Sequence, residues 1–179
     1  MNKAVLSFWK GLCFRHNIGK IRKAVMNYLT DEGIKTEIQN GSIFTTLDDC
    51  TYTIDFYLDD EYPRCDIEFS TKDEDYQKLE LSHKTFIADK VNTDEYRHSV
   101  VKSFDNSLSA ETHFYFTDKR MLLTLFYVYF MDLKSTVNDM IEIAVDQMQK
   151  EKNKKPIGFA ISRNNEQQAE DTKFAASHN

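Results

Sequence analysis

The sequence predicts an α+β protein in which helices pack on one face of a single antiparallel sheet. Apolar residues recur at the helical period over residues 17–32, at the two-residue strand period over 34–82, and at the helical period again after 118. Asn40-Gly41 is the typical two-residue turn of a β-hairpin, because both positions of a type I′ turn need a positive φ. Strands joined by such turns pair antiparallel and often leave one face of the sheet in water. The expected order of elements is α-β-β-β-β-β-α-β-β-α.

The chain is expected to divide into three parts. Residues 1–16 are an apolar N-terminal segment, containing Phe8 and Trp9, that can form a short helix. Residues 17–150 are expected to fold as a single α+β domain, since 41% hydrophobic residues are enough for one core. Residues 151–179 are polar and aperiodic, and they are expected to be a disordered tail.

The first helix of the domain is predicted over residues 17–32. Asn17 stands where a capping side chain is expected, and Gly33 stands where a helix commonly ends. Between them the apolar positions follow spacings of three and four residues: Ile18, Ile21, Val25 and Leu29. This spacing predicts an amphipathic helix with one buried side.

A meander of five strands is expected next, over residues 34–39, 42–47, 51–58, 65–70 and 76–82. Tyr52, Ile54 and Phe56 alternate with polar neighbours, which predicts one apolar and one wet face. Acidic pairs such as Asp48-Asp49 fall where the meander must turn. Turn chemistry therefore explains them better than a calcium site does.

A second helix is predicted over residues 83–95, followed by a hairpin of strands at 99–104 and 107–116. Beyond it, "MLLTLFYVYFM", residues 121–131, is apolar at every position except Thr124. This stretch is either the start of one long helix over about 118–150 or a last strand before a shorter helix. Its length falls well short of the roughly 20 residues that a membrane-spanning helix needs.

If these residues are helical, two apolar stripes run along the helix. The longer stripe is expected to lie on the sheet: Leu122, Phe126, Tyr129, Leu133, Val137, Met140, Ala144 and Met148. The shorter stripe, of Leu123, Tyr127 and Phe130, needs a second cover, because large apolar patches rarely stay exposed. The segment around Phe8 and Trp9 and a second copy of the chain are equally suitable covers. The predicted apolar residues for partner binding are therefore Leu123, Tyr127, Phe130, Phe8 and Trp9.

Charge and cysteine content narrow the classes of function. A net charge of -6 and a pI near 5.4 argue against nucleic-acid binding, which needs a basic patch. The cysteines, Cys13, Cys50 and Cys65, are too widely spaced for a zinc or redox pair, and no metal or other cofactor is expected. The sequence contains no recognisable signal peptide or membrane span, so a cytoplasmic location is expected.

Two constellations of polar residues are candidates for chemistry or binding. His98 and His113 come close if their strands pair, with Glu111 beside them, which gives a weak candidate for a small-ligand pocket or an enzyme site. On the wet face of the meander, Asp55 is expected to lie opposite Glu68, an unfavourable like-charge pair that makes both residues candidates for partner binding.

The like-charge pair depends on a register in which Phe56 lies opposite Ile67. Lys78, on the expected fifth strand, is placed to offset the repulsion within the chain. The alternative is an acidic sheet face that meets a basic partner segment.

Residues 65–104 read "CDIEFSTKDEDYQKLELSHKTFIADKVNTDEYRHSVVKSF". The expected order there is strand, acidic turn, strand, a helix containing "IADKVN", and strand. In this order the chain resembles the YbjN-like group of bacterial proteins, which share a fold with the type III secretion chaperones, over roughly residues 17–150. The resemblance implies a small cytoplasmic protein, often dimeric, that binds other proteins. It implies no catalytic signature.

The sequence thus favours a non-enzymatic protein-binding or chaperone-like module, expected to form a homodimer and to hold a protein or peptide client. Glycine-rich phosphate loops and nucleophile motifs are absent from the sequence, which argues against enzymes of familiar types. Two alternatives stay open. One is a small-ligand protein or enzyme with a pocket near His98, Glu111 and His113, and the other is a structural subunit of a larger complex.

Overall fold

The computed structural model describes residue 14 and residues 16–58, 61–71 and 74–153, and it confirms the predicted α+β class. The chain separates into two compact units, Met1–Met148 and Gln149–Asn179, and the sheet belongs to the first. Most of the predicted N-terminal segment 1–16 and of the predicted tail 151–179 lies outside the described residues. Phe8 and Trp9 are among the residues that are not described.

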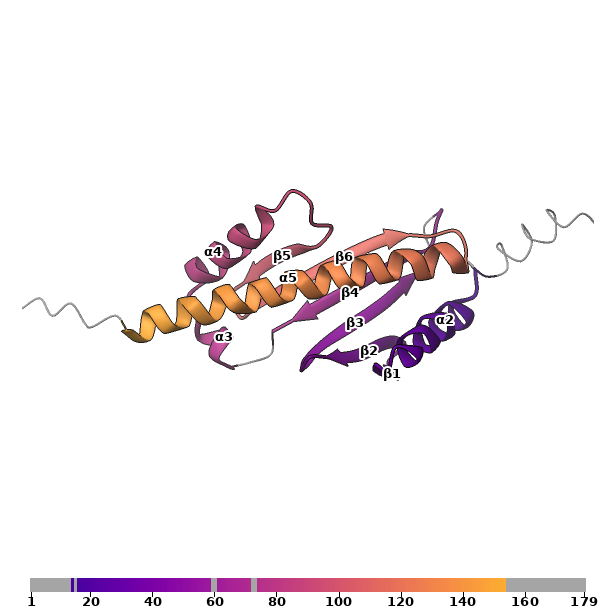
Figure 1. Cartoon of the computed structure of the whole chain (residues 1–179), viewed down its shortest axis with the longest axis horizontal. Coiled ribbons are helices and arrows are strands. Elements are labelled where there is room, and N and C mark those ends of the chain that lie inside the picture. The colour runs from indigo at the N-terminus through magenta and orange to yellow at the C-terminus, as the bar shows by residue number, and fades with distance from the viewer. Residues whose placement is uncertain (1–13, 15, 59–60, 72–73, 154–179) are drawn as a thin grey trace, which may run out of the picture. The chain divides into compact units, whose positions relative to one another are not determined.

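The described strands form one six-stranded antiparallel sheet in the order β1-β2-β3-β4-β6-β5. In chain order the elements are α2 (Ile18–Asp31), β1 (Lys35–Gln39), β2 (Ser42–Leu47), β3 (Cys50–Tyr57), β4 (Arg64–Ser70), α3 (Glu74–Lys78), α4 (Leu81–Asn92), β5 (Val100–Phe104), β6 (Ser107–Tyr115) and α5 (Lys119–Asn153). Figure 1 shows α5 running across the sheet, with α2 near β1 and α4 near β5. One face of the sheet is therefore packed on helices, as predicted.

The predicted first helix and first hairpin are confirmed together with their end signals. The Asn17 side chain caps α2 by accepting a hydrogen bond from the Lys20 N–H at 2.9 Å. Gly33, just past the helix, has φ 78°, and the Asn40-Gly41 turn has φ values of 52° and 91°. The buried side of α2 carries Ile21, Ala24, Val25 and Leu29.

The strand predicted at residues 76–82 is wrong. This stretch contains the end of α3 and the start of α4 instead. Alternation would place Leu79 and Leu81 on the same buried face, but Leu79 is 4% exposed and Leu81 is 48% exposed. Tyr76 packs against the core at helical spacing from Leu79, so the segment reaches the core as a helical turn.

A buried lysine holds this region together. Lys84 of α4 has no exposed surface, and its ammonium donates hydrogen bonds to two backbone carbonyl oxygens. One belongs to Gln77 in α3, at 3.2 Å, and the other to Asp105 in the turn between β5 and β6. A single side chain thus joins two helices and a hairpin turn. A buried charge is tolerated because it is hydrogen-bonded.

Residues 121–131 are helical, which decides between the two alternatives for this stretch. Asp118 starts α5, since its Oδ1 accepts hydrogen bonds from the N–H groups of Arg120 at 2.8 Å and Met121 at 3.0 Å. The core-facing residues follow steps of four and three: Leu122, Phe126, Phe130, Leu133, Val137, Met140 and Ala144. Tyr129, which the prediction placed in this stripe, is half-buried and packs against the core, whereas Phe130, which the prediction left out of it, is buried.

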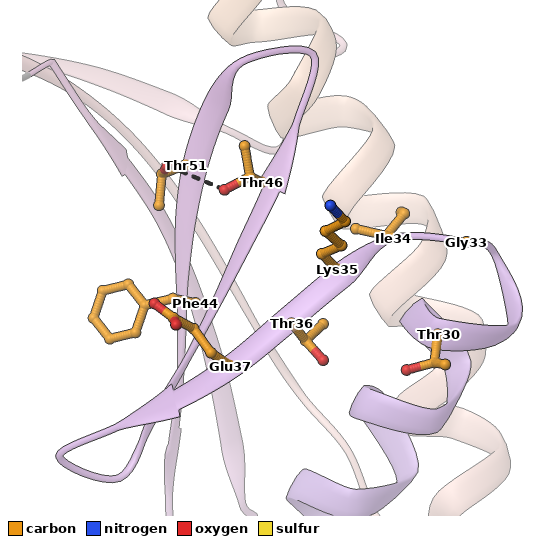
Figure 2. A pocket seen from close by; sticks show the side chains of 9 residues that line it. All are labelled: Thr30, Gly33, Ile34, Lys35, Thr36, Glu37, Phe44, Thr46 and Thr51. Carbon is orange, nitrogen blue, oxygen red and sulfur yellow. Dashed lines mark hydrogen bonds between the residues drawn. The ribbon is translucent and has the colours of Figure 1, made fainter.

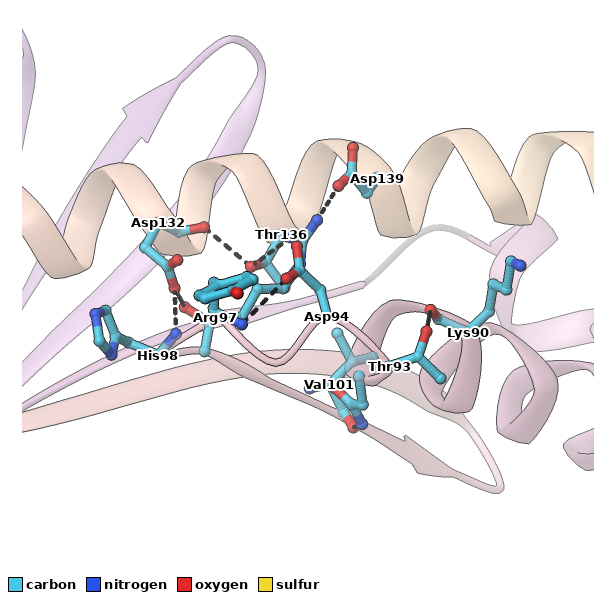
Figure 3. A network of polar contacts seen from close by, with 12 residues as sticks. Lys90, Thr93, Asp94, Arg97, His98, Val101, Asp132, Thr136 and Asp139 are labelled. Atoms are coloured by element: carbon cyan, nitrogen blue, oxygen red, sulfur yellow. Dashed lines mark hydrogen bonds and ion pairs between the residues drawn. The ribbon is translucent and has the colours of Figure 1, made fainter.

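A polar clamp fixes the connection between α4 and β5 to the middle of α5 (Figure 3). Arg97 donates a hydrogen bond to Thr136 Oγ1 at 2.9 Å and forms an ion pair with Asp139. Asp132 Oδ2 accepts hydrogen bonds from the His98 backbone N–H at 3.1 Å and the Ser99 hydroxyl at 2.6 Å. These contacts set where α5 lies across the sheet, because they join residues more than 30 positions apart in the chain.

Candidate protein-interaction surface

The first turns of α5 carry apolar side chains on the side that faces away from the sheet. We call four of them the α5 apolar face: Met121, 40% exposed, Tyr127, 54%, Val128, 44%, and Met131, 42%. Spacings of seven and three residues place Met121, Val128 and Met131 on one side of the helix. Farther along the same side, Ser135 and Asn138 are exposed polar residues. Among the described residues, four of the five exposed large apolar side chains of α5 therefore lie in its first half, and the fifth is Val145, 38% exposed.

The predicted second stripe coincides with this face only in part. Tyr127 is exposed as expected, and Leu123 is half-buried against the core. Phe130 is 3% exposed, with its ring stacked 5.4 Å from that of Phe126 and meeting the ring of Tyr52 edge-on at 5.2 Å. The assignment of Phe130 to the second stripe is therefore wrong. The helix turns by about 100° per residue, so residues four apart, such as Phe126 and Phe130, lie on the same, sheet-facing side.

A second surface is the face of the sheet that α5 does not cover. Alternate residues of the three central strands point to it: Thr53, Asp55 and Tyr57 of β3, Arg64, Asp66 and Glu68 of β4, and Glu111, His113 and Tyr115 of β6. We call these residues the outer sheet face. All of them are at least partly exposed, so this face meets solvent.

Like charges lie directly opposite each other on the outer sheet face. Asp55 pairs with Asp66, and Glu68 pairs with Glu111. The predicted opposition of Asp55 and Glu68 is wrong, because the register is shifted by two residues and Phe56 lies opposite Cys65 instead of Ile67. A shift of two residues keeps the same side chains on each face. Asp55 therefore still lies opposite an acidic residue, which is Asp66 instead of Glu68.

Neighbouring side chains offset part of this repulsion. Arg64 Nε lies 2.8 Å from Asp66 Oδ1, Lys102 forms an ion pair with Glu111, and the Ser42 hydroxyl donates to Asp55. Lys78, predicted to offset it from a fifth strand, lies in α3 instead.

Glu68 shows the electrostatic consequence. Partial burial and the adjacent Glu111 carboxylate raise the pKa of Glu68, whereas Lys102 acts to lower it. The outer sheet face therefore disfavours the charged form of the Glu68 carboxyl group.

The histidine constellation expected from the sequence does not assemble. The His98 ring stacks on Tyr129 of α5, with ring centres 4.9 Å apart, on the helix-covered side of the sheet. His113 lies on the outer sheet face with Glu111, opposite Asp66. The two side chains thus occupy opposite faces, although Thr112 Oγ1 donates a hydrogen bond to the His98 carbonyl oxygen at 3.1 Å.

An open pocket of about 820 Å³ lies at the β1 edge of the sheet (Figure 2). Its lining consists of Thr30, Gly33, Ile34, Lys35, Thr36, Glu37, Phe44, Thr46 and Thr51. Four of these nine residues are threonines, and the lining contains neither histidine nor cysteine, so it has no obvious nucleophile-base pair.

Within the described ranges, no group of His, Cys, Asp and Glu residues is arranged to hold a metal ion. None of the described helices is long and apolar enough to cross a membrane.

Comparison with known proteins adds evidence on the fold alone. No family model matches the chain, and no curated protein matches it. Among solved structures, it is similar to an uncharacterized protein from Methanothermobacter thermautotrophicus, with a TM-score of 0.50 and 12% identity over 72% of this chain and 99% of that chain. At this identity the likeness supports a shared fold. The resemblance to the YbjN-like group stays a prediction.

Several residues of these two surfaces were not predicted from the sequence. Met121, Val128 and Met131 lie within the apolar stretch, and their spacing of seven and three was a usable signal for a third side of the helix. Asp66 was detectable only with the correct β3–β4 register, and the opposition of Glu68 and Glu111 only with the β4–β6 register. The first register depends on the connection between β3 and β4, where the sequence shows no typical two-residue turn.

Proposed function

We propose that this chain is a non-enzymatic protein-binding module of the chaperone-like kind, working in the cytoplasm as a reversible homodimer that also holds a protein or peptide client. The observation that carries the proposal is the α5 apolar face, where four large side chains remain 40–54% exposed. Exposed apolar patches rimmed by polar residues commonly mark protein-interaction sites.

The size of this face favours weak association. Four half-exposed side chains offer less than the ~800 Å² that each partner buries in a standard stable interface. A contact of this size suits a partner that binds and leaves. A client or a second copy would therefore compete for the face at micromolar concentrations.

The enzyme alternative has less support. It depended on His98, Glu111 and His113 sharing a pocket, and the His98 ring lies on the helix-covered side of the sheet while the other two lie on the outer sheet face. A general base and its partner need to be within hydrogen-bond reach of one substrate position. A small-ligand role would fall to the pocket near β1 instead.

Measurement of the molecular mass in solution over a range of concentrations tests the proposal. We expect reversible dimerisation that Val128→Lys weakens at least about tenfold, because burial of a valine is worth ~1.5–3 kcal/mol and ~1.4 kcal/mol is a factor of ten. Lysine favours helices more than valine does, so α5 should stay intact.

Tyr96→Lys is the matched control, since Tyr96 is 90% exposed and lies outside α5. It should leave the dimer unchanged. Two results together would contradict the proposed function. The first is a monomeric mass at every concentration. The second is that every protein captured from the native cell by the wild type is also captured by Val128→Lys.

A further inference from the structure

We propose that the β1 edge of the sheet pairs antiparallel with the β1 edge of a second copy, so that two sheets join into one. The β1 edge consists of Ile34, Lys35, Thr36, Glu37 and Ile38, and β1 is an end strand of the sheet. The inference goes beyond the proposed function, because the β1 edge is separate from the α5 apolar face and its pairing does not need the α5 contact.

The hairpin geometry determines which backbone groups of β1 point outward. Gln39 and Ser42 flank the two-residue turn, so they form a hydrogen-bonded pair, and such pairs alternate along the ladder. The N–H and C=O groups of Thr36 and Ile38 therefore point away from β2. Among the described residues, no backbone group outside the β1–β2 ladder hydrogen-bonds to either of them.

The opposite edge of the sheet is different. The same alternation, counted from the pair of Phe104 and Ser107, points the backbone groups of Val101 outward from β5. There the Asn92 side chain satisfies both groups at 2.8 Å. Four of the five residues of the β1 edge instead line the open cavity of about 820 Å³ (Figure 2). An added strand therefore finds free backbone groups and open space at β1.

The β1 edge is self-complementary when two copies pair with Thr36 opposite Thr36. On one face of the joined sheet, this register places Lys35 of each copy opposite Glu37 of the other. On the other face it places Ile34 opposite Ile38, which is 49% exposed in the single chain. The outward backbone groups of the two Thr36 residues then hydrogen-bond to each other.

The charges of the β1 edge select this register and this partner. Charged side chains on an edge strand usually discourage pairing. Lys35 and Glu37 have opposite charges and lie two residues apart, so an antiparallel copy brings each beside its opposite. A register centred on Glu37 would place this carboxylate opposite itself, which is unfavourable.

The contact is small, so the association is expected to be weak. It involves about five residues from each copy, whereas a standard stable interface involves roughly 20–30. We expect a dissociation constant of about 1 mM, so the β1 edge pairs only when the protein is more concentrated than the α5 contact requires. Two different isologous contacts on one chain would then build assemblies larger than a dimer.

Sedimentation equilibrium of full-length Val128→Lys isolates the β1 edge, because this substitution weakens the α5 contact. Between about 0.1 and about 2 mM we expect a monomer–dimer equilibrium. Adding Lys35→Glu should raise the dissociation constant at least about fivefold, because each new carboxylate lies opposite Glu37 of the other copy. Adding Lys35→Glu and Glu37→Lys together should restore the dimer, since the two charges are only exchanged across the interface.

Lys90→Glu is the matched control for the change in charge. Lys90 is an exposed residue of α4, which contacts β5 at the opposite edge of the sheet. This substitution should leave the millimolar dimer unchanged.

A disulfide tests the register directly. With Thr36→Cys, the two new cysteines lie opposite each other with Cα atoms about 5.5 Å apart, a separation that a disulfide can bridge. Oxidation of the concentrated Val128→Lys protein should therefore form a bond between the two cysteines at position 36, which peptide mass spectrometry identifies. Thr46→Cys, at an exposed residue of β2, should not form the equivalent bond.

Four results would each overturn the inference: a Val128→Lys protein that is monomeric at about 2 mM, a dimer that Lys35→Glu leaves intact, a double substitution that does not restore pairing, or no disulfide at position 36. Micromolar dimerisation of the wild type alongside any of these would keep the proposed function. Millimolar pairing that follows the charge exchange, without any association that depends on Val128, would support the β1 contact and remove the α5 dimer.

Discussion

At the scale of single residues, Glu68 is held in an unfavourable electrostatic position. Its cross-strand neighbour is Glu111, and partial burial together with that carboxylate raises its pKa. A carboxyl group whose pKa is raised on folding binds its proton more tightly in the folded state. Folding stability contributed by this group is therefore lost as the pH rises from the unfolded value, about 4.3, through the folded pKa.

We therefore predict that Glu68→Gln increases the free energy of unfolding at pH 7 and that the gain disappears near pH 4. Urea denaturation at both pH values measures it. Glu142→Gln, a neutralised exposed glutamate on α5, is the control for the general loss of negative charge. Equal effects of the two substitutions at pH 7 would show that the cross-strand carboxylates do not repel each other appreciably.

At the scale of elements, the sheet ends at β5, and a side chain covers part of that edge. Asn92, the last residue of α4, donates from Nδ2 to the Val101 carbonyl oxygen and accepts at Oδ1 from the Val101 N–H, both at 2.8 Å. The amide thereby takes the place of a neighbouring strand at one residue. Unpaired strand edges invite pairing with other chains, so this contact limits where β5 can be extended.

Asn92→Ala is expected to destabilise the fold by about 1–3 kcal/mol, because both backbone groups of Val101 lose their partner. Amide hydrogen exchange at Val101 should accelerate by more than the global change in stability accounts for. Asn138→Ala, at an exposed asparagine of α5, should have little effect on either measurement. Unchanged exchange at Val101 in Asn92→Ala would mean that the edge is protected by something other than this side chain.

At the scale of the whole molecule, the two sides of α5 have different roles. The side that faces the sheet is part of the core, and the polar clamp through Arg97 and Asp132 fixes the helix in place. The α5 apolar face is left on a rigid support, which suits a binding surface because little ordering is needed when a partner arrives.

Dimerisation at this face would be linked to folding stability. We predict that the Tm of the wild type rises as the protein concentration increases from about 1 to about 100 μM, since a partner that binds only the folded state stabilises it by mass action. The Tm of Val128→Lys should be nearly independent of concentration. A concentration-independent Tm in the wild type would indicate that folding and association are not linked in this range.

The sequence by itself determined the elements whose signals are local. The cap at Asn17 and the turn at Asn40-Gly41 depend on a few adjacent residues, and both were predicted correctly. Alternation along β3 likewise predicted which side chains face the core, because strand periodicity is independent of the neighbouring strand.

Tertiary structure alone decided the features that depend on distant partners. Leu79 and Leu81 suit a strand or a helix equally, and the choice came from packing against the core. The partner of Asp55 and the burial of Phe130 depend on strand register and on how α5 is rotated over the sheet. Long-range contacts set both, and no short stretch of sequence contains them.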